Sequence, residues 1–171
     1  AGTDTYDGEE GSDTLDYSSY GASNSIEIQL AANLDAQVKV TGSDNHTIRN
    51  IENIVGSQGA DIIHGDGEVN NISGGEGNDT IYGSAKSDTL AGQGGTGDIL
   101  TYENLTGSGI TLNLTSSTAG TALYGADSST DNFSGFESFY MTTKADILNG
   151  SSQADTVNGL GGDDTFNASG G

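Results

Sequence analysis

The sequence predicts an all-β fold, a short solenoid in which brief strands alternate with turns rich in glycine and aspartate. Three observations support this prediction. The 171-residue chain contains 28 glycines and no proline. Aspartates recur at intervals of nine residues, and a large apolar residue follows two positions after each of them. Apolar and polar residues also alternate with a period of two between these arrays, which indicates further strands with one buried face.

The stretch from Gly74 to Tyr82 is the clearest unit of the nine-residue pattern. It reads Gly-Gly-Glu-Gly-Asn-Asp-Thr-Ile-Tyr and fits G-G-x-G-x-D-x-U-x, where U is a large apolar residue. Its glycines allow backbone conformations that other residues avoid. Asp79 offers oxygen ligands, and Ile81 falls at the inward position of a short strand. Each unit therefore predicts a turn, a cation ligand and a strand.

The same spacing continues through most of the chain. The positions equivalent to Asp79 are Asp4 and Asp13; Asp61, Asn70 and Asp88; Asp98, after a one-residue insertion; and Asp146, Asp155 and Asp164. The apolar residues expected to point inward are Tyr6, Leu15, Ile63, Ile72, Ile81, Leu90, Leu100, Leu148, Val157 and Phe166. A disordered linker would need no such fixed period.

A longer repeat of about 85 residues predicts two units. The segment 13–17 recurs at 98–102, and the segment 60–65 recurs at 145–150. The first unit spans residues 1–85, with nonapeptides at 1–16 and 56–85 around an interruption at 17–55. The second spans residues 86–171, with nonapeptides at 86–101 and 141–171 around an interruption at 102–140.

Both interruptions are predicted to be extra β segments. Alternation predicts strands at 26–30 and 110–114, and Val38 and Val40 suggest another. Apolar residues spaced by three fit either one helical turn or apolar rungs beside the solenoid. Strong helix formers are scarce around them, which favours rungs. These residues are Ile48, Ile51 and Ile54 in the first unit and Phe133, Phe136 and Phe139 in the second.

Composition excludes several classes of function. Asp and Glu number 25 against four Lys and Arg, so the formal charge of −21 opposes compaction and argues against nucleic acid as a partner. Hydrophobic residues make up only 32% of the chain, so an acidic disordered linker is the expected state without metal. There is no cysteine and no apolar run long enough to span a membrane. Both chain ends fall inside the repeat pattern, as expected of a piece of a longer protein.

Aspartates and exposed carbonyls in glycine turns predict a site for a hard cation. Calcium takes about 6–8 oxygen ligands, more than one turn can supply. If two nonapeptides form one coil, equivalent turns stack 18 residues apart and an ion between them bridges neighbouring coils.

The array resembles the RTX hemolysin-type calcium-binding family. The resemblance implies a right-handed parallel β-roll that binds several Ca²⁺ ions between stacked turns. Carried onto this chain, it pairs Asp61 with Asp79, Asn70 with Asp88, Asp79 with Asp98, and Asp146 with Asp164. The implied metal ligands are Asp4, Asp13, Asp61, Asn70, Asp79, Asp88, Asp98, Asp146, Asp155 and Asp164, with carbonyls of Gly56, Gln58, Gly59, Gly74, Gly75, Glu76, Gly77, Gly159, Gly161 and Gly162.

Some turns depart from the consensus. Lysines Lys86 and Lys144 take the fourth turn position, where their stems can extend outward. The second glycine is replaced by Glu9, Ser57, Ser84, Gln93, Ser151 and Leu160.

The predicted function is a calcium-binding structural module that folds and stiffens outside the cell. It would belong to a larger secreted or cell-surface, adhesin-like bacterial protein, with neighbouring RTX modules as partners. The resemblance implies export in the unfolded state through a type I secretion channel. The alternative is an accessory carbohydrate-binding module of a secreted polysaccharide-modifying enzyme. Its groove would use Tyr17, Tyr20, Tyr102, Tyr124 and Tyr140, although packing beside the roll explains these tyrosines as well.

No catalytic residues are predicted. His46 and His64 are the only histidines, and Asn149 replaces His64 in the second unit. The many acidic pairs follow from the repeat period, without acid–base chemistry.

Overall fold

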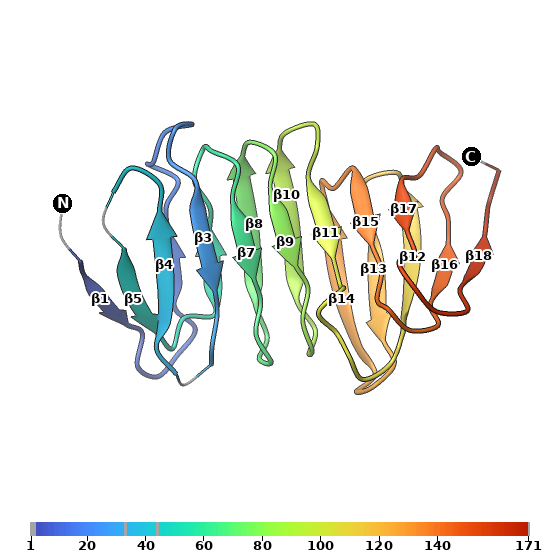
Figure 1. Ribbon diagram of the computed structural model, residues 1–171, viewed down its shortest axis with the longest axis horizontal. Helices are drawn as coiled ribbons and strands as arrows, with labels where there is room; N and C mark the ends of the chain where they lie inside the picture. Colours follow the sequence, from blue (N-terminus) through green and yellow to red (C-terminus); the bar gives the residue numbers. More distant parts are fainter. Residues whose placement is uncertain (1–2, 33, 44, 171) are drawn as a thin grey trace.

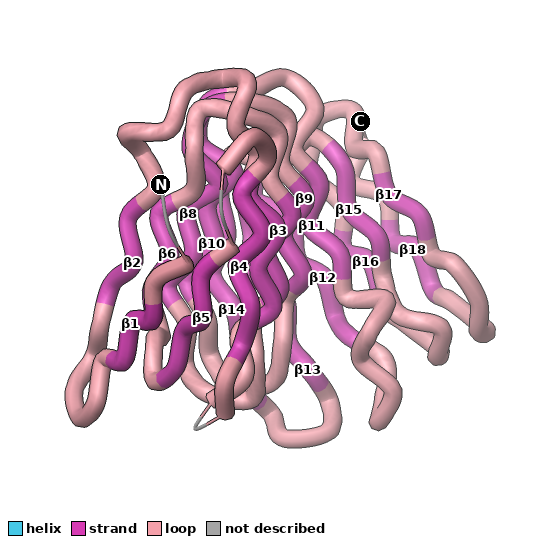
Figure 2. Tube along the Cα trace, turned by 60° about the vertical axis from the view of Figure 1, so that its left-hand side comes forward, coloured by secondary structure: helices cyan, strands magenta, loops and turns pink. Residues whose placement is uncertain are grey.

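The computed structural model describes residues 3–32, 34–43 and 45–170. Over these residues it contains 18 strands and no helix, which confirms the all-β prediction. The strands form two sheets of nine strands each, which lie one behind the other along a single long axis (Figure 1). Figure 2 shows the same two layers joined by turns at both edges.

The two sheets, called here sheet A and sheet B, take alternate strands along most of the chain. Sheet A has the order β1 (Thr5–Asp7), β5 (His46–Arg49), β4 (Ala36–Val40), β3 (Ile26–Gln29), β7 (Ile62–His64), β9 (Thr80–Tyr82), β11 (Ile99–Thr101), β15 (Ser138–Tyr140) and β17 (Val157–Asn158). Sheet B has the order β18 (Thr165–Asn167), β16 (Ile147–Asn149), β12 (Ile110–Ser116), β13 (Ala119–Tyr124), β14 (Ser129–Ser134), β10 (Thr89–Gly94), β8 (Asn71–Glu76), β6 (Asn53–Val55) and β2 (Thr14–Asp16).

Two nonapeptides form one coil of the solenoid, as the sequence predicts. In sheet A, β7 pairs with β9 in parallel and Ile63 lies opposite Ile81. In sheet B, β8 pairs with β10 and Ile72 lies opposite Leu90. Both pairs are 18 residues apart. The next sheet A pair sets Ile81 opposite Leu100, so the one-residue insertion is absorbed in the turn before β11.

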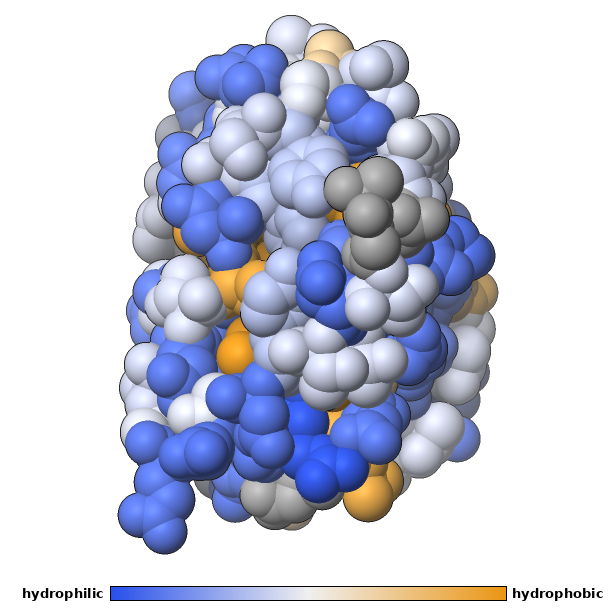
Figure 3. Space-filling view, turned by 90° about the vertical axis from the view of Figure 1, so that its left-hand side faces the viewer, coloured by the Kyte–Doolittle hydropathy of each residue, from blue (hydrophilic) through white to orange (hydrophobic). Residues whose placement is uncertain are grey.

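The inward apolar residues fill a continuous core between the sheets. The central ones, Ile63, Ile81 and Leu100 among them, are completely buried. Tyr6 and Phe166 were also expected inside, but they are 39% and 55% exposed. That expectation is wrong because β1 and β18 are end strands, with no further coil to cover them. Figure 3 shows the end at β1, where apolar atoms are visible between polar side chains.

Each interruption is a three-stranded antiparallel meander inserted into one sheet. In sheet A, β5, β4 and β3 lie between β1 and β7. In sheet B, β12, β13 and β14 lie between β16 and β10. The outer strands of each meander pair in parallel with the neighbouring coils, so the roll continues through both interruptions. The strands predicted near 26–30 and 110–114 are confirmed as β3 and β12.

The apolar residues spaced by three are rungs of the core. Ile48 lies in β5 of sheet A, Ile54 lies in β6 of sheet B, and Ile51 lies at the corner between them. All three are buried, and Phe133, Phe136 and Phe139 are buried as well. The preference for rungs over a helical turn is confirmed. We expected these residues to lie beside the solenoid, and that position is wrong. In each set of three, one residue points into the core from sheet A, one points into it from sheet B, and the middle one lies at the corner between the sheets.

Strands β1–β9 fall within residues 1–85 and strands β10–β18 fall within residues 86–171. Each predicted unit therefore has nine strands among the described residues. Each strand of the first unit lies in the opposite sheet from its counterpart in the second, for example β3 in sheet A and β12 in sheet B. The two meanders therefore widen opposite faces of the roll. Both sheets cross the boundary without a break, since β8 pairs with β10 and β9 pairs with β11.

Candidate metal centre

The turns stack in two rows along the edges of the roll. The upper edge in Figure 1 carries the turns that lead into sheet A, and the lower edge carries those that lead into sheet B. We define the upper row by the last residue of each turn, Asp61, Asp79, Asp98 and Glu137, and the lower row by Asp13, Glu52, Asn70, Asp88, Asp131, Asp146 and Asp164.

Within each row, a side chain accepts the backbone N–H of its equivalent one coil earlier. In the upper row, Asp61 N–H donates to Asp79 Oδ1 and Asp79 N–H donates to Asp98 Oδ1, both at 2.8 Å. In the lower row, Asn70 N–H donates to Asp88 Oδ1 at 2.9 Å, and Asp146 N–H donates to Asp164 Oδ1 at 3.0 Å. The structure thus brings together all four pairs that the sequence suggested.

Three acidic residues in the rows were missed by the sequence reasoning. Asp98 N–H donates to Glu137 Oε2 at 2.8 Å, and Asp13 N–H donates to Glu52 Oε2 at 2.9 Å. Asp88 N–H donates to Asp131 Oδ1 at 2.9 Å. The signal was present, because each of these acids stands two residues before an apolar one, as in Asp-x-Ile. None of the three acids follows a glycine-rich turn of the nonapeptide type, so the consensus does not include them.

Burial governs the electrostatics of the rows. Asp61, Asp79, Asp88 and Asp98 are at most 1% exposed. Loss of hydration raises the pKa of Asp79 to about 7, with a further contribution from the neighbouring Asp61 and Asp98 carboxylates. Burial likewise raises the pKa of Asp131 to about 7 and that of Asp88 to about 6. The pKa values of Asp61 and Asp98 shift upward for the same reason.

Several carboxylate oxygens in the rows have no protein partner. Asp13 Oδ2, Asp79 Oδ2 and Asp98 Oδ2 are buried and accept no hydrogen bond. A buried polar atom without a partner costs about 1–3 kcal/mol, so such atoms are rare in native structures. A bound cation would satisfy these oxygens directly.

Backbone carbonyls line the space between neighbouring turns. A β-carbon at Gly75 would collide with the Ser57 carbonyl oxygen, and one at Gly95 would collide with the Gly77 carbonyl oxygen. Only glycine leaves room for these oxygens. A groove of about 1070 Å³ runs over the upper turns, with Ser57, Gly75 and Gln93 among its lining residues. The Glu76 carboxylate is the one acidic group among its described lining residues, and backbone carbonyls beside a carboxylate suit a hard, oxygen-liganded cation.

The carboxylates are spaced one per turn, so a shared ion would draw on two turns. Within residues 3–32, 34–43 and 45–170, no three acidic or histidine side chains converge into one cluster. Backbone carbonyls would therefore complete the coordination.

Comparison with known families agrees with this geometry. The model of the RTX calcium-binding nonapeptide repeat matches four times, at residues 1–16, 50–81, 64–99 and 142–171. Together these matches cover more than half of the chain. The chain belongs to the RTX calcium-binding repeat family. Its RTX repeats bind multiple Ca²⁺ ions, and the family is structural. No curated protein matches the chain.

Two of the remaining predicted ligands, Asp4 and Asp155, precede strands near the ends of sheet A. Asp4 precedes β1, and its N–H donates to His46 Nδ1 at 3.4 Å, so His46 takes the position that an acid holds elsewhere. Asp155 precedes β17 and accepts hydrogen bonds from Ser151. The carbonyls of Gly56, Gln58, Gly59, Gly74, Gly75, Glu76 and Gly77 belong to upper turns, and those of Gly159, Gly161 and Gly162 belong to the lower turn before β18.

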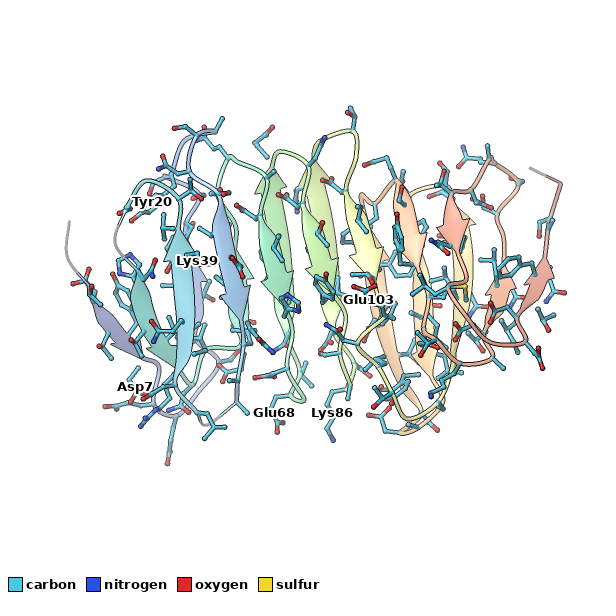
Figure 4. The ribbon with its side chains drawn as sticks, viewed as in Figure 1. Asp7, Tyr20, Lys39, Glu68, Lys86 and Glu103 are labelled. Atoms are coloured by element: carbon cyan, nitrogen blue, oxygen red, sulfur yellow. The ribbon has the colours of Figure 1, made fainter. Side chains whose placement is uncertain are left out.

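The two lysines in RTX turns extend away from the rows. Lys86 and Lys144 are both exposed, and Figure 4 shows Lys86 and Glu68 projecting outward from the lower edge. Their charges therefore stay in solvent. Over the described part of the chain, there is no helix of the length and hydrophobicity needed to cross a membrane.

Most of the tyrosines that might have formed a glycan groove pack against the core. Tyr17 and Tyr102 are 3% and 2% exposed, and Tyr20 and Tyr124 are half-buried against the core. Their packing role is confirmed.

Tyr17 and Tyr102 form a matched pair for mutation. Tyr102 O–H donates to Asp131 Oδ2 at 2.8 Å, whereas the buried Tyr17 hydroxyl has no partner. We expect Tyr102→Phe to lower the free energy of unfolding by about 1.5–3 kcal/mol, the range for hydrogen bonds to charged groups. Tyr17→Phe should leave it unchanged or raise it. Urea unfolding in saturating calcium measures both, and an equal loss in the two variants would contradict the assignment.

Proposed function

We propose that this chain is a calcium-dependent structural module that folds and stiffens when ions fill the spaces between its stacked turns. The observation that carries the proposal is the pair of rows of buried carboxylates, in which several oxygens have no partner. Calcium would neutralise these rows and link each coil to the next. A roll held together along both edges in this way resists bending and extension.

Without calcium, two effects oppose the folded state. The formal charge of −21 is concentrated partly in the rows, where carboxylates stack on carboxylates. Each ordered residue also costs about 1–2 kcal/mol of backbone entropy. A site at ten times its dissociation constant contributes about 1.4 kcal/mol by mass action. Several coupled sites would make folding a cooperative response to calcium.

The calcium dependence favours a role outside the cell. Extracellular calcium modules commonly bind at about 10⁻⁴–10⁻³ M, far above cytosolic calcium. Proteins with RTX repeats are typically exported by type I secretion. We propose that this module belongs to a larger secreted or surface protein, next to further RTX modules. The ligands would come from the aspartates and turn carbonyls predicted from the sequence.

We propose no catalytic role for either histidine. His46 is 5% exposed and continues the stacking of the turns. His64 stacks on Tyr82, with 3.8 Å between the ring centroids. Both side chains therefore have contacts that explain their presence.

A calcium titration followed by far-UV circular dichroism tests the proposal. We expect a disordered spectrum in metal-free buffer and a cooperative rise of β signal as calcium increases. Excess chelator should reverse the change, and magnesium at equal concentration should produce much less of it. A full β spectrum that survives removal of calcium would contradict coupled folding.

A further inference from the structure

Eight turns of the array are of two kinds, and the second turn residue separates them; turn 65–70, with Asp66 at this position, belongs to neither kind. In four turns this residue is a serine or threonine, and we call them hydroxyl turns. They span 56–61, 83–88, 141–146 and 150–155, with Ser57, Ser84, Thr142 and Ser151 at the second position. In four others the second residue has a positive φ, and we call them open turns. They span 8–13, 74–79, 92–98 and 159–164, with Glu9 at 62°, Gly75 at 105°, Gln93 at 70° and Leu160 at 59°.

In a hydroxyl turn, the terminal aspartate is bonded by its own turn. Ser57 Oγ donates to Asp61 Oδ1 at 2.7 Å, and Ser57 N–H donates to Asp61 Oδ2 at 2.6 Å. Thr142 makes the same two bonds to Asp146, at 2.8 Å and 2.9 Å. Ser151 binds Asp155 in the same way, and Ser84 Oγ donates to Asp88 Oδ2 at 2.7 Å. Both oxygens of each of these carboxylates have a protein donor.

In an open turn, the left-handed second residue makes no such bond to the carboxylate. Among the described residues, the buried carboxylate oxygens without a partner all belong to open turns, namely Asp13 Oδ2, Asp79 Oδ2 and Asp98 Oδ2. Asp79 and Asp98 are both 0% exposed. The turns 74–79 and 92–98 are neighbours in the upper row, and Asp79 N–H donates to Asp98 Oδ1. They form an adjacent pair of open turns.

The division recurs with the 85-residue spacing at three of the four pairs of counterpart turns; the exception is turn 65–70, with Asp66 at the second position, whose counterpart 150–155 is a hydroxyl turn. Turn 56–61 and its counterpart 141–146 are both hydroxyl turns. Turn 74–79 and its counterpart 159–164 are both open, and so are 8–13 and 92–98. Recurrence at equivalent positions argues that the two kinds have different roles.

We propose that calcium binds at the open turns, with the space between turns 74–79 and 92–98 as the principal site, whereas the hydroxyl turns are closed without metal. This inference rests on the proposed calcium-dependent function and narrows it. Asp79 and Asp98 supply the unpartnered oxygens, and carbonyls of the same turns complete the ligand set. In the hydroxyl turns a serine or threonine already supplies the donors that a cation would replace. The number of bound ions is then smaller than the number of turn aspartates.

Two reciprocal substitutions in the full chain test the proposal. Gln93→Ser supplies a hydroxyl for Asp98 and should weaken calcium binding at the principal site about tenfold or more, the size of change typical for groups that contact metal ligands. Gln93→Ala removes the side chain without adding a hydroxyl and should bind like the parent. Ser57→Gly removes the hydroxyl donor and lets residue 57 take the left-handed conformation of Gly75, which turns its N–H away from Asp61 Oδ2. Only Ile26 N–H would then donate to this carboxylate, so the variant should increase the number of bound ions. Ser57→Thr keeps the hydroxyl and should not.

Titration calorimetry with calcium chloride measures affinity and ion number, and circular dichroism on the same samples measures folding. The proposal is overturned if the two Gln93 variants bind alike and the two Ser57 variants bind equal numbers of ions. A chain that folds with calcium yet gives that result contradicts this inference alone. A chain that stays folded without calcium but shows the expected variant pattern contradicts only the coupled folding proposed above.

Discussion

Replacing Asp131 by alanine should lower the free energy of unfolding of the calcium-loaded protein by about 2–6 kcal/mol. Asp131 is 2% exposed and accepts two hydrogen bonds, from Asp88 N–H at 2.9 Å and from Tyr102 O–H at 2.8 Å. Alanine leaves both donors buried without an acceptor, and each such group costs about 1–3 kcal/mol. Natural domains are stable by only about 5–15 kcal/mol, so this loss is a large share of the total.

Urea unfolding in saturating calcium measures the loss, and Asp131→Asn is the matched control. Asparagine keeps the shape of the side chain, an acceptor oxygen for Asp88 N–H and a polar group beside Tyr102. It should therefore retain most of the stability. If alanine and asparagine destabilise equally, the negative charge is what matters, and the hydrogen-bond argument is wrong.

The fold could be predicted because one short pattern sets both the turn and the core. An aspartate followed two residues later by an apolar residue fixes which side chain points inward and where each strand begins. Ile63, Ile72, Ile81 and Leu90 are all buried for that reason. The spacing of nine also set the pairing of turns at 18 residues, which the hydrogen bond from Asp61 N–H to Asp79 Oδ1 reproduces.

Parts of the site could not be predicted because the rows extend beyond the consensus. Glu52, Glu137 and Asp131 hold the same positions as the turn aspartates but are not preceded by a glycine-rich nonapeptide. Glutamate reaches the donor with one more methylene, so its backbone can lie slightly farther back. The division into open and hydroxyl turns also lay outside the sequence reasoning. The serines and the threonine are visible in the sequence, but their bonds to the turn aspartate are not, and neither is the positive φ of Glu9, Gln93 and Leu160.

The way the chain runs through each interruption depends on how many strands the meander contains, and the amino-acid composition does not give that number. Period-two alternation located β3 and β12, but nothing in it fixes how many strands each meander adds. Three strands return the chain to the same sheet, and this keeps both rows in register across the insertion. A meander of two strands would have placed the next turn on the wrong edge.

Acidification should stabilise the metal-free protein. Burial raises the pKa of Asp79 and of Asp131 to about 7 and that of Asp88 to about 6, from an ordinary value of 3.8. Between about pH 4 and pH 7 the folded state therefore binds more protons than the unfolded chain. Stability then falls as pH rises through this window and is regained as pH is lowered. Metal-free protein should gain β signal in circular dichroism when the pH is lowered from 8 to 5.

The stabilisation that calcium provides should have the opposite pH dependence and increase as the pH rises, because protons and the cation compete for the same carboxylates. The gain in β signal on adding saturating calcium to metal-free protein should be largest at pH 8 and shrink toward pH 5. Protein freed of metal by dialysis gives a cleaner comparison than a chelator, whose own affinity falls in acid. Asp79→Asn is neutral at every pH, so it should flatten the metal-free profile. A metal-free β signal that stays level or falls on acidification would show that the rows are not the dominant source of repulsion.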